Sequence, residues 1–586
     1  MPALQAPLDR ELTRRRFIAI ALLILLAGTT LRTLWLRADP PTTAVGVVWH
    51  DEGAWVHNAR NRALFGEWRL DAWNPMFVAP VFTALEYGSF ATFGVGTWQA
   101  RLVSEGMGTI SVIALALGVA AIAGRRAGLI AAVLLATNYV YVMWNRAALM
   151  EATMTAFMVV AWSAYAIAGH GRVAVESDSS PHFHMTSAPL GLVAGTAAWF
   201  AFFTKAAAAF FVGAIGLEAL VTLWLVGRGE GRAWWQDSRA KAALWTIAGL
   251  TAAALIALAV FVIPYWQEFR FYNWQMSVTR KPAYTVKAFL DRLSWIPIIH
   301  DVFTRQWLVT LFGICGALGL LTRWRTATPA ERLLGLWIGL GVAELIAHDV
   351  GNERRFIFFI PALVALAGIV LGRDRRLLPT EAGLISRRQA LLATPLLLFA
   401  AYIVTGAIVR IPFIYQVRPG VYLGAIAAVL VVAFLLLNWP RIVAWLSSAR
   451  WPLASSVVLT GVVVAGDLTQ FAQWAVLRTY ENVHASRLVG EWLPPGTLVH
   501  GKLANGLALE NRIRPVFVGR GFGNYEDRTR RPDIRYVLTY VEPRLGYEGS
   551  VILDVLDAHP GWRVIREFDV AETAQGHDRA ALIRKP

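Results

Sequence analysis

The chain has 586 residues, of which 56% are hydrophobic and 16% charged, and it contains 25 tryptophans. This composition excludes an ordinary soluble multidomain protein and is typical of a polytopic membrane protein. The net charge of +16 comes from arginines scattered between apolar segments, which favours membrane topology and anionic headgroups over a nucleic-acid partner. Cys315 is the single cysteine, which excludes an intramolecular disulfide and a thiolate metal cluster.

The first apolar stretch runs from 17 to 36 and is about the length of one membrane span. It follows Arg14, Arg15 and Arg16, which gives it some likeness to a twin-arginine export signal. No small-residue cleavage site follows before Arg37. We therefore expect an uncleaved first helix whose N-terminus is cytoplasmic.

A polar run at 47 to 68 follows this helix and contains the adjacent carboxylates Asp51 and Glu52. A carboxylate at mid-membrane costs roughly 2.5 to 3.5 kcal/mol, so both should lie where water or a charged substrate reaches them. One interpretation is that they only cap an interfacial helix at 51 to 65, because acids favour a helix N-terminus. The other is that Asp51 is a catalytic base, which accepts a proton from a bound hydroxyl.

Thirteen apolar stretches are candidates for membrane spans of about 20 residues. They lie at 17 to 36, 105 to 123, 127 to 144, 152 to 168, 188 to 203, 206 to 227, 242 to 264, 306 to 321, 333 to 348, 355 to 372, 390 to 410, 420 to 438 and 454 to 474. The stretch 188 to 227 must hold two helices, because at 1.5 Å per residue one helix would be about twice the hydrocarbon thickness. Thr204-Lys205 is the expected turn between them.

The segment 75 to 94 is long enough to cross a membrane but contains two prolines, two glycines and Glu86. If this segment lies in the interface, the arginine-rich loops all fall on the cytoplasmic side, as the positive-inside rule requires. We therefore expect about 13 spans and a long outer loop at 37 to 104 that carries interfacial helices.

This topology places the remaining unusual polar residues on the outer face. They are Asp51, Glu52, Arg146, Glu151, Lys205, His348, Arg354 and Arg355, with Arg280 and Lys281 in the loop 265 to 305. Basic residues in outer loops oppose the usual charge bias and therefore indicate an anionic ligand. The alternative for each single residue is snorkelling to lipid headgroups.

After the transmembrane domain at 1 to 474, the composition becomes that of a water-soluble domain at 475 to 586. Strands are predicted at 497 to 500, 515 to 518, 534 to 541, 562 to 570 and 580 to 584, and helices at 480 to 492 and 551 to 558. Helices that alternate with apolar strands indicate a small α/β domain. Thirteen preceding spans would make this domain extracytoplasmic.

These features, in this order, resemble the membrane-embedded (GT-C type) glycosyltransferases that use polyprenyl-phosphate donors, especially protein O-mannosyltransferases and lipid A aminoarabinose transferases. The resemblance covers residues 15 to 372 by motif and the remainder by layout. Its motifs are Asp51-Glu52, Gly94 to Leu102 with Arg101-Leu102, Arg146 with Leu149 and Glu151, Thr204-Lys205-Ala206, and Arg355-Phe356 with Pro361. The third residue of the Thr-Lys turn is glycine in the family, and the residue after Arg355 is tyrosine.

The resemblance implies an enzyme of the plasma membrane that moves a hexosyl or pentosyl group from a polyprenyl-phosphate donor to a protein, lipid or glycan hydroxyl on the extracytoplasmic face. Asp51 would be the base of an inverting reaction, while Glu52 or Glu151 would position the acceptor or act as the nucleophile of a retaining path. The groups that would neutralise the leaving phosphate are Lys205, Arg354, Arg355 and Arg146, with His348, Arg280 and Lys281 as further candidates.

Two alternatives stay open. His50, Asp51 and His57 could bind a divalent metal ion such as Mn²⁺, Mg²⁺ or Zn²⁺, because imidazole and carboxylate suit these ions. The competing function is a transporter or flippase of a lipid-linked or anionic substrate, although transporters usually carry charges at the midplane and inverted repeats. In either case we expect membrane lipids as partners, no nucleic acid, and a monomer.

Overall fold

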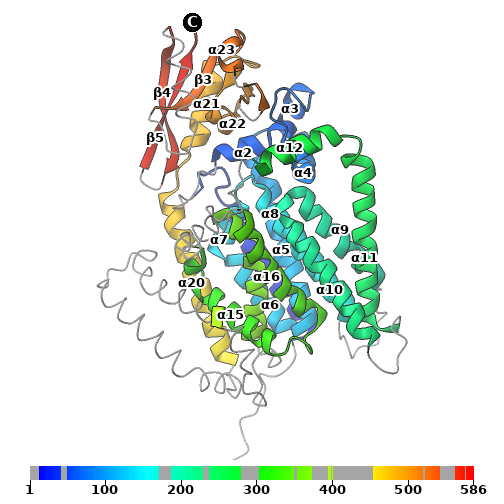
Figure 1. The fold of residues 1–586 in the computed structure, drawn as a ribbon. Coiled ribbons are helices and arrows are strands. Elements are labelled where there is room, and N and C mark those ends of the chain that lie inside the picture. The colour runs from blue at the N-terminus through cyan, green and yellow to red at the C-terminus, as the bar shows by residue number, and fades with distance from the viewer. Residues whose placement is uncertain are drawn as a thin grey trace, which may run out of the picture.

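The structure is a computed structural model. It describes residues 12–40, 49–170, 187–228, 236–278, 302–348, 353–372, 394–396, 399, 453–518, 522–524, 526–541, 561–573 and 576–586. Most of these residues form a bundle of long helices, and a small sheet lies at one end of it (Figure 1). The expected spans at 390 to 410 and 420 to 438 fall almost entirely outside the described residues.

The helical bundle consists of apolar helices whose bounds follow the predicted spans. They are α1 (Arg14–Thr33), α5 (Thr97–Ala123), α6 (Arg125–Thr137), α7 (Tyr139–Asn145), α8 (Met150–His170), α9 (Ser187–Thr204), α10 (Ala209–Gly227), α11 (Ser238–Ala257), α15 (Trp307–Thr322), α16 (Pro329–His348), α17 (Phe359–Leu371) and α20 (Leu453–Leu477). Among the described helices, six are long and apolar enough to cross a membrane, or seven if the bent pair α6 and α7 is one span. The chain is therefore a multi-pass membrane protein, while the figure of about 13 spans stays a prediction.

The span expected at 127 to 144 is not one straight helix. It bends by 60° at Asn138, between α6 and α7. The Asn138 side chain accepts a hydrogen bond from the Tyr141 amide, which caps α7, and donates to Gln306 Oε1. The Tyr139 amide, which has no partner within α7, donates to Asp467 Oδ1 on α20. These side-chain partners replace the backbone bonds that the bend removes.

The stretch 188 to 227 folds as two helices, as predicted. α9 ends at Thr204, a 3-10 turn follows at Ala206–Ala208, and α10 begins at Ala209. Lys205 has an extended backbone between the two helices. This turn directs the Lys205 side chain toward the first turn of α8.

The first loop contains α2 (Trp49–Trp55), α3 (His57–Phe65), a 3-10 turn at Pro75–Phe77 and α4 (Pro80–Phe93). The helix considered at 51 to 65 is thus divided at Val56. α4 has 14 residues, which at 1.5 Å per residue is shorter than the hydrocarbon layer. α17, at an expected span, is one residue shorter, so the interfacial position of 75 to 94 stays a prediction. α12 (Trp266–Val278) lies near these helices at the same end of the bundle (Figure 1).

A five-stranded sheet forms from the C-terminal residues, in the order β2-β1-β3-β5-β4. Its strands are β1 (Leu498–His500), β2 (Arg514–Val516), β3 (Tyr536–Tyr540), β4 (Arg563–Thr573) and β5 (Gly576–Arg584). β1 pairs in parallel with β2 and β3, whereas β5 pairs antiparallel with β3 and β4. Three helices accompany the sheet: α21 (Glu481–Trp492), α22 (Lys502–Gly506) and α23 (Asp527–Arg530). The sheet and these helices lie at the end of the bundle that carries α2 and α3 (Figure 1). The predicted helix at 551 to 558 falls outside the described residues.

Candidate active site

Asp51 lies in the first half of α2 and points to a basic turn that is 303 residues later in the chain. Arg354 belongs to the 3-10 turn Glu353–Phe356, between α16 and α17. Its Nη1 donates to Asp51 Oδ2 at 2.8 Å. The Asp51 side chain keeps 23% of its surface exposed, whereas that of Arg354 keeps 9%. Asp51 is therefore held by an arginine and is still reached by solvent.

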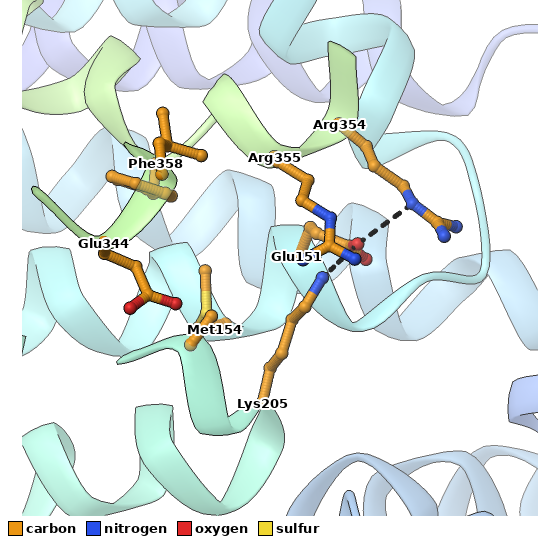
Figure 2. A pocket seen from close by; sticks show the side chains of 9 residues that line it. Glu151, Met154, Lys205, Glu344, Arg354, Arg355 and Phe358 are labelled. Atoms are coloured by element: carbon orange, nitrogen blue, oxygen red, sulfur yellow. Dashed lines mark hydrogen bonds and ion pairs between the residues drawn. The ribbon is translucent and has the colours of Figure 1, made fainter. Parts of the chain in front are cut away.

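Glu151, in the first turn of α8, collects the basic residues around it. Lys205 Nζ donates to Glu151 Oε1, and Arg354 Nε lies 3.3 Å from the same oxygen. Figure 2 shows Lys205, Arg354 and Arg355 pointing toward Glu151. Arg354 thus bridges Glu151 and Asp51, so that one continuous set of ion pairs joins α2, α8 and the turn after α9.

A small pocket opens beside this cluster. It is lined by Glu151, Met154, Lys205, Ala207, Glu344, Leu345, Arg354, Arg355 and Phe358. Three cations against two carboxylates leave the lining with a net positive charge. The other lining side chains are apolar, as is common in ligand pockets.

Burial lowers the pKa of Lys205 to about 8, from a usual value of 10.5. Glu151 opposes this shift, while the positive charges of Arg355 and Arg354 add to it. The Lys205 side chain retains 15% of its surface exposed, so it is accessible from the pocket. An anion bound in this pocket would favour the charged form of Lys205.

Glu52 is directed away from this cluster although it follows Asp51 in the sequence. Both of its carboxylate oxygens accept from Arg101, at 2.8 Å each, and Oε1 also accepts from the Ala148 amide. The Glu52 side chain is only 2% exposed. Arg101 in turn donates to the carbonyls of Leu36 and Ala38. This pair fastens α2 to α5 and to the end of α1.

Arg146, a predicted phosphate ligand, is not among the residues that line the pocket. Its guanidinium donates to the carbonyls of Leu31, Arg32 and Trp35 and lies 4.5 Å from the ring centroid of Trp474. These carbonyls lie at the C-terminal end of α1, where a helix leaves acceptors without internal partners. Arg146 therefore caps α1.

Of the residues proposed for a metal, His57 and Asp51 do not converge, and the side chain of His50 lies outside the described part of the chain. His57 Nε2 lies 2.9 Å from Asp71 Oδ1, and both side chains are buried. Asp51 faces Arg354 instead. The described part of the chain holds no group of three or more His, Cys, Asp or Glu side chains that could bind a metal ion. The described contacts of Asp51 and His57 thus do not fit a site for a divalent metal ion.

Three other candidates cannot be placed in the site. Arg280 and Lys281 lie outside the described residues, and His348 is described only as the last residue of α16. Glu344, one turn before His348, lines the pocket and was not among the predicted residues. A carboxylate within a predicted apolar span is a signal for a functional site, and that signal was present in the sequence.

Known proteins resemble this chain in sequence and in fold. Residues 56–273 match the family model described as "Dolichyl-phosphate-mannose-protein mannosyltransferase". The chain is similar to the apo structure of ArnT from Cupriavidus metallidurans, with a TM-score of 0.53, 16% identity and 97% of each chain covered. It is also similar to ArnT from the same organism bound to undecaprenyl phosphate, with a TM-score of 0.51, 15% identity and 97% of each chain covered. No curated protein sequence matches the chain.

The family match covers two of the elements that build the site, α8 and the turn at Lys205, and the structural similarity covers nearly the whole chain. The predicted resemblance is thereby confirmed: residues 56–273 match the mannosyltransferase family model, and the chain has the fold of ArnT.

Proposed function

We propose that this protein transfers a sugar from a polyprenyl-phosphate donor to an acceptor hydroxyl on the extracytoplasmic face of the membrane. The observation that carries this proposal is the ion-pair set Asp51-Arg354-Glu151-Lys205 beside a positively charged pocket. It places a solvent-accessible carboxylate next to cations that could hold a phosphate. The ligand named for one similar ArnT structure, undecaprenyl phosphate, belongs to the proposed class of donor lipid.

In the proposed reaction the acceptor hydroxyl gives its proton to Asp51 while its oxygen forms a bond to the anomeric carbon. The bond between that carbon and the phosphate oxygen breaks, and its electron pair leaves with the phosphate. Lys205, Arg354 and Arg355 stabilise the charge that develops there, and such fixed cations are effective in a site that excludes water. One direct displacement inverts the anomeric configuration.

Glu151 has a different role in this proposal. Its buried carboxylate contacts both Lys205 and Arg354, which fixes these cations at one side of the pocket. A carboxylate already engaged by two cations is poorly suited to attack the anomeric carbon. Glu151 therefore positions the phosphate ligands.

The direct test uses the protein in lipid nanodiscs. Undecaprenyl phosphate should bind saturably, as followed by native mass spectrometry. Undecaprenyl-phosphate sugars from a radiolabelled panel of hexoses and pentoses should lose their label to hydroxyl acceptors in native membranes. A protein that neither binds undecaprenyl phosphate nor transfers any sugar of the panel would overturn the proposal.

The proposed face is tested by cysteine labelling in a Cys315→Ala background. A membrane-impermeant reagent applied to whole cells should modify Glu491→Cys, on α21, and spare Lys241→Cys, on α11. Both positions are exposed, so reagent access depends on the side of the membrane. The opposite pattern would place the site on the cytoplasmic face.

A further inference from the structure

The helix that carries Asp51 packs directly on the C-terminal sheet region. At Gly53, two residues after Asp51, an added Cβ would overlap the backbone carbonyl of Asn505 and lie 3.2 Å from the Gly506 nitrogen. Asn505 and Gly506 belong to α22, the helix between β1 and β2. The two backbones are thus in contact, with no side chain between them.

Arg60 provides a second connection, one helix further along the first loop. It is 1% exposed, and its guanidinium donates to the carbonyls of Ala508, Asn511 and Ile513 at 2.9 to 3.0 Å. These carbonyls belong to the segment that follows α22 and leads to β2. A buried guanidinium without its acceptors would bear a large desolvation cost, so this contact specifies how α3 meets the sheet region.

Asp71 provides the third connection. Its Oδ2 accepts from the Phe517 amide at 2.8 Å, while Oδ1 faces His57. Trp73 stacks on Phe517 with ring centroids 5.3 Å apart and also contacts Trp55, the last residue of α2, at 5.6 Å. Trp73 therefore connects the C-terminal end of α2 to Phe517, the residue that follows β2.

From these three connections we propose that the segment 502–517 positions Asp51. α22 supports α2 at Gly53, and the contacts at Arg60 and Asp71 fix the orientation of the loop that follows α2. The proposed phosphate ligands Lys205, Arg354 and Arg355 come from other elements, the turn after α9 and the turn 353–356. This inference rests on the proposed function for its effect on catalysis, although its structural part does not.

The test is Gly53→Ala in the full-length protein in nanodiscs, with Gly88→Ala as the matched control. Gly88 is helical like Gly53, but it is exposed, and an added Cβ there meets no atom within 4 Å. Gly53→Ala should raise hydrogen exchange in residues 49–55 by about tenfold or more, because it separates α2 from its support. The rate of sugar transfer at saturating donor should fall about 10- to 100-fold, since small displacements of a catalytic group have effects of this size.

The affinity for undecaprenyl phosphate should stay that of the unmodified protein in Gly53→Ala, and Gly88→Ala should change none of the three measurements. Arg60→Gln is the second variant, in case Gly53→Ala does not fold, and should give the same pattern. Normal exchange in 49–55 together with a normal rate would overturn the proposal. An equal rise of hydrogen exchange throughout the helical bundle would also overturn the proposal, because the substitution would then affect the whole bundle and not α2 in particular.

The exchange measurement separates this inference from the proposed function. If the unmodified protein transfers no sugar, the proposed function fails, yet a rise of exchange confined to 49–55 would still show that α22 holds α2. If the unmodified protein transfers sugar and Gly53→Ala does so at the same rate with unchanged exchange, only the positioning role fails.

Discussion

Asp51 and Glu52 are neighbours on one short helix and have opposite surroundings. Glu52 is 2% exposed, and its oxygens are occupied by Arg101 and by the Ala148 amide. Asp51 is 23% exposed and forms an ion pair with Arg354, one of the residues that line the pocket. Because successive residues of a helix point about 100° apart, an adjacent pair can face two different environments. A carboxylate whose oxygens are filled by the protein stabilises the fold, whereas one that remains accessible can act on a substrate.

The sharpest test of this comparison is Asp51→Asn. Asparagine keeps the shape of the side chain and an oxygen that can accept from Arg354, but it cannot accept the proton of the acceptor hydroxyl. Sugar transfer should fall at least about 100-fold, as expected for loss of a general base. The protein should remain folded, and the affinity for undecaprenyl phosphate should not fall, because the charge that is lost is negative. Glu67→Gln, at an exposed acid of the same loop, is the control; near-normal turnover in Asp51→Asn would remove Asp51 from the chemistry.

Glu52→Ala should give the opposite result, a loss of stability. It leaves Arg101 buried without its carboxylate, and breaking a buried pair from one side costs about 3 to 5 kcal/mol. The free energy of unfolding, measured by denaturant titration in detergent, should fall by that amount. If Glu52→Ala is as stable as the unmodified protein but inactive, then Glu52 and Asp51 act together and the contrast between them is wrong.

Lys205→Ala tests the phosphate side of the site. A charge-assisted contact is worth about 1.5 to 3 kcal/mol, so the affinity for undecaprenyl phosphate should fall roughly 10- to 150-fold. Lys241→Ala, at an exposed lysine of α11, should bind normally. Equal affinities in the two variants would mean that Lys205 only neutralises Glu151.

The smallest expected effect is a pH dependence of binding. Lys205 has a pKa of about 8, so it is charged below that pH and loses its proton above it. The affinity for undecaprenyl phosphate should therefore decrease as the pH rises through about 8. At higher pH the affinity should level off no lower than the affinity of Lys205→Ala. Lys205→Arg should remove this decrease, because a guanidinium stays protonated in this range. A decrease that persists in Lys205→Arg belongs to another group.

Periodicity and charge were enough to predict the membrane class, the turn at Lys205 and the strands near 498 and 536, because each depends on local pattern. The sequence also indicated Asp51 and Arg354 separately. Their contact could not be derived, because it joins residues 303 positions apart. For Arg146 the charge suggested a phosphate ligand, but its guanidinium donates to carbonyls at the end of α1. The sequence could not show this contact, because no sequence pattern reveals where a helix end points.

The contact between Arg60 and Ala508 spans 448 residues and has a consequence for how the protein is made. During synthesis the first loop leaves the ribosome long before the segment that will accept its buried arginine. Pairings of such separation form late and leave their partners exposed to incorrect contacts meanwhile. The contacts of α2 and α3 with residues 505–513 can therefore form only after synthesis has reached those residues.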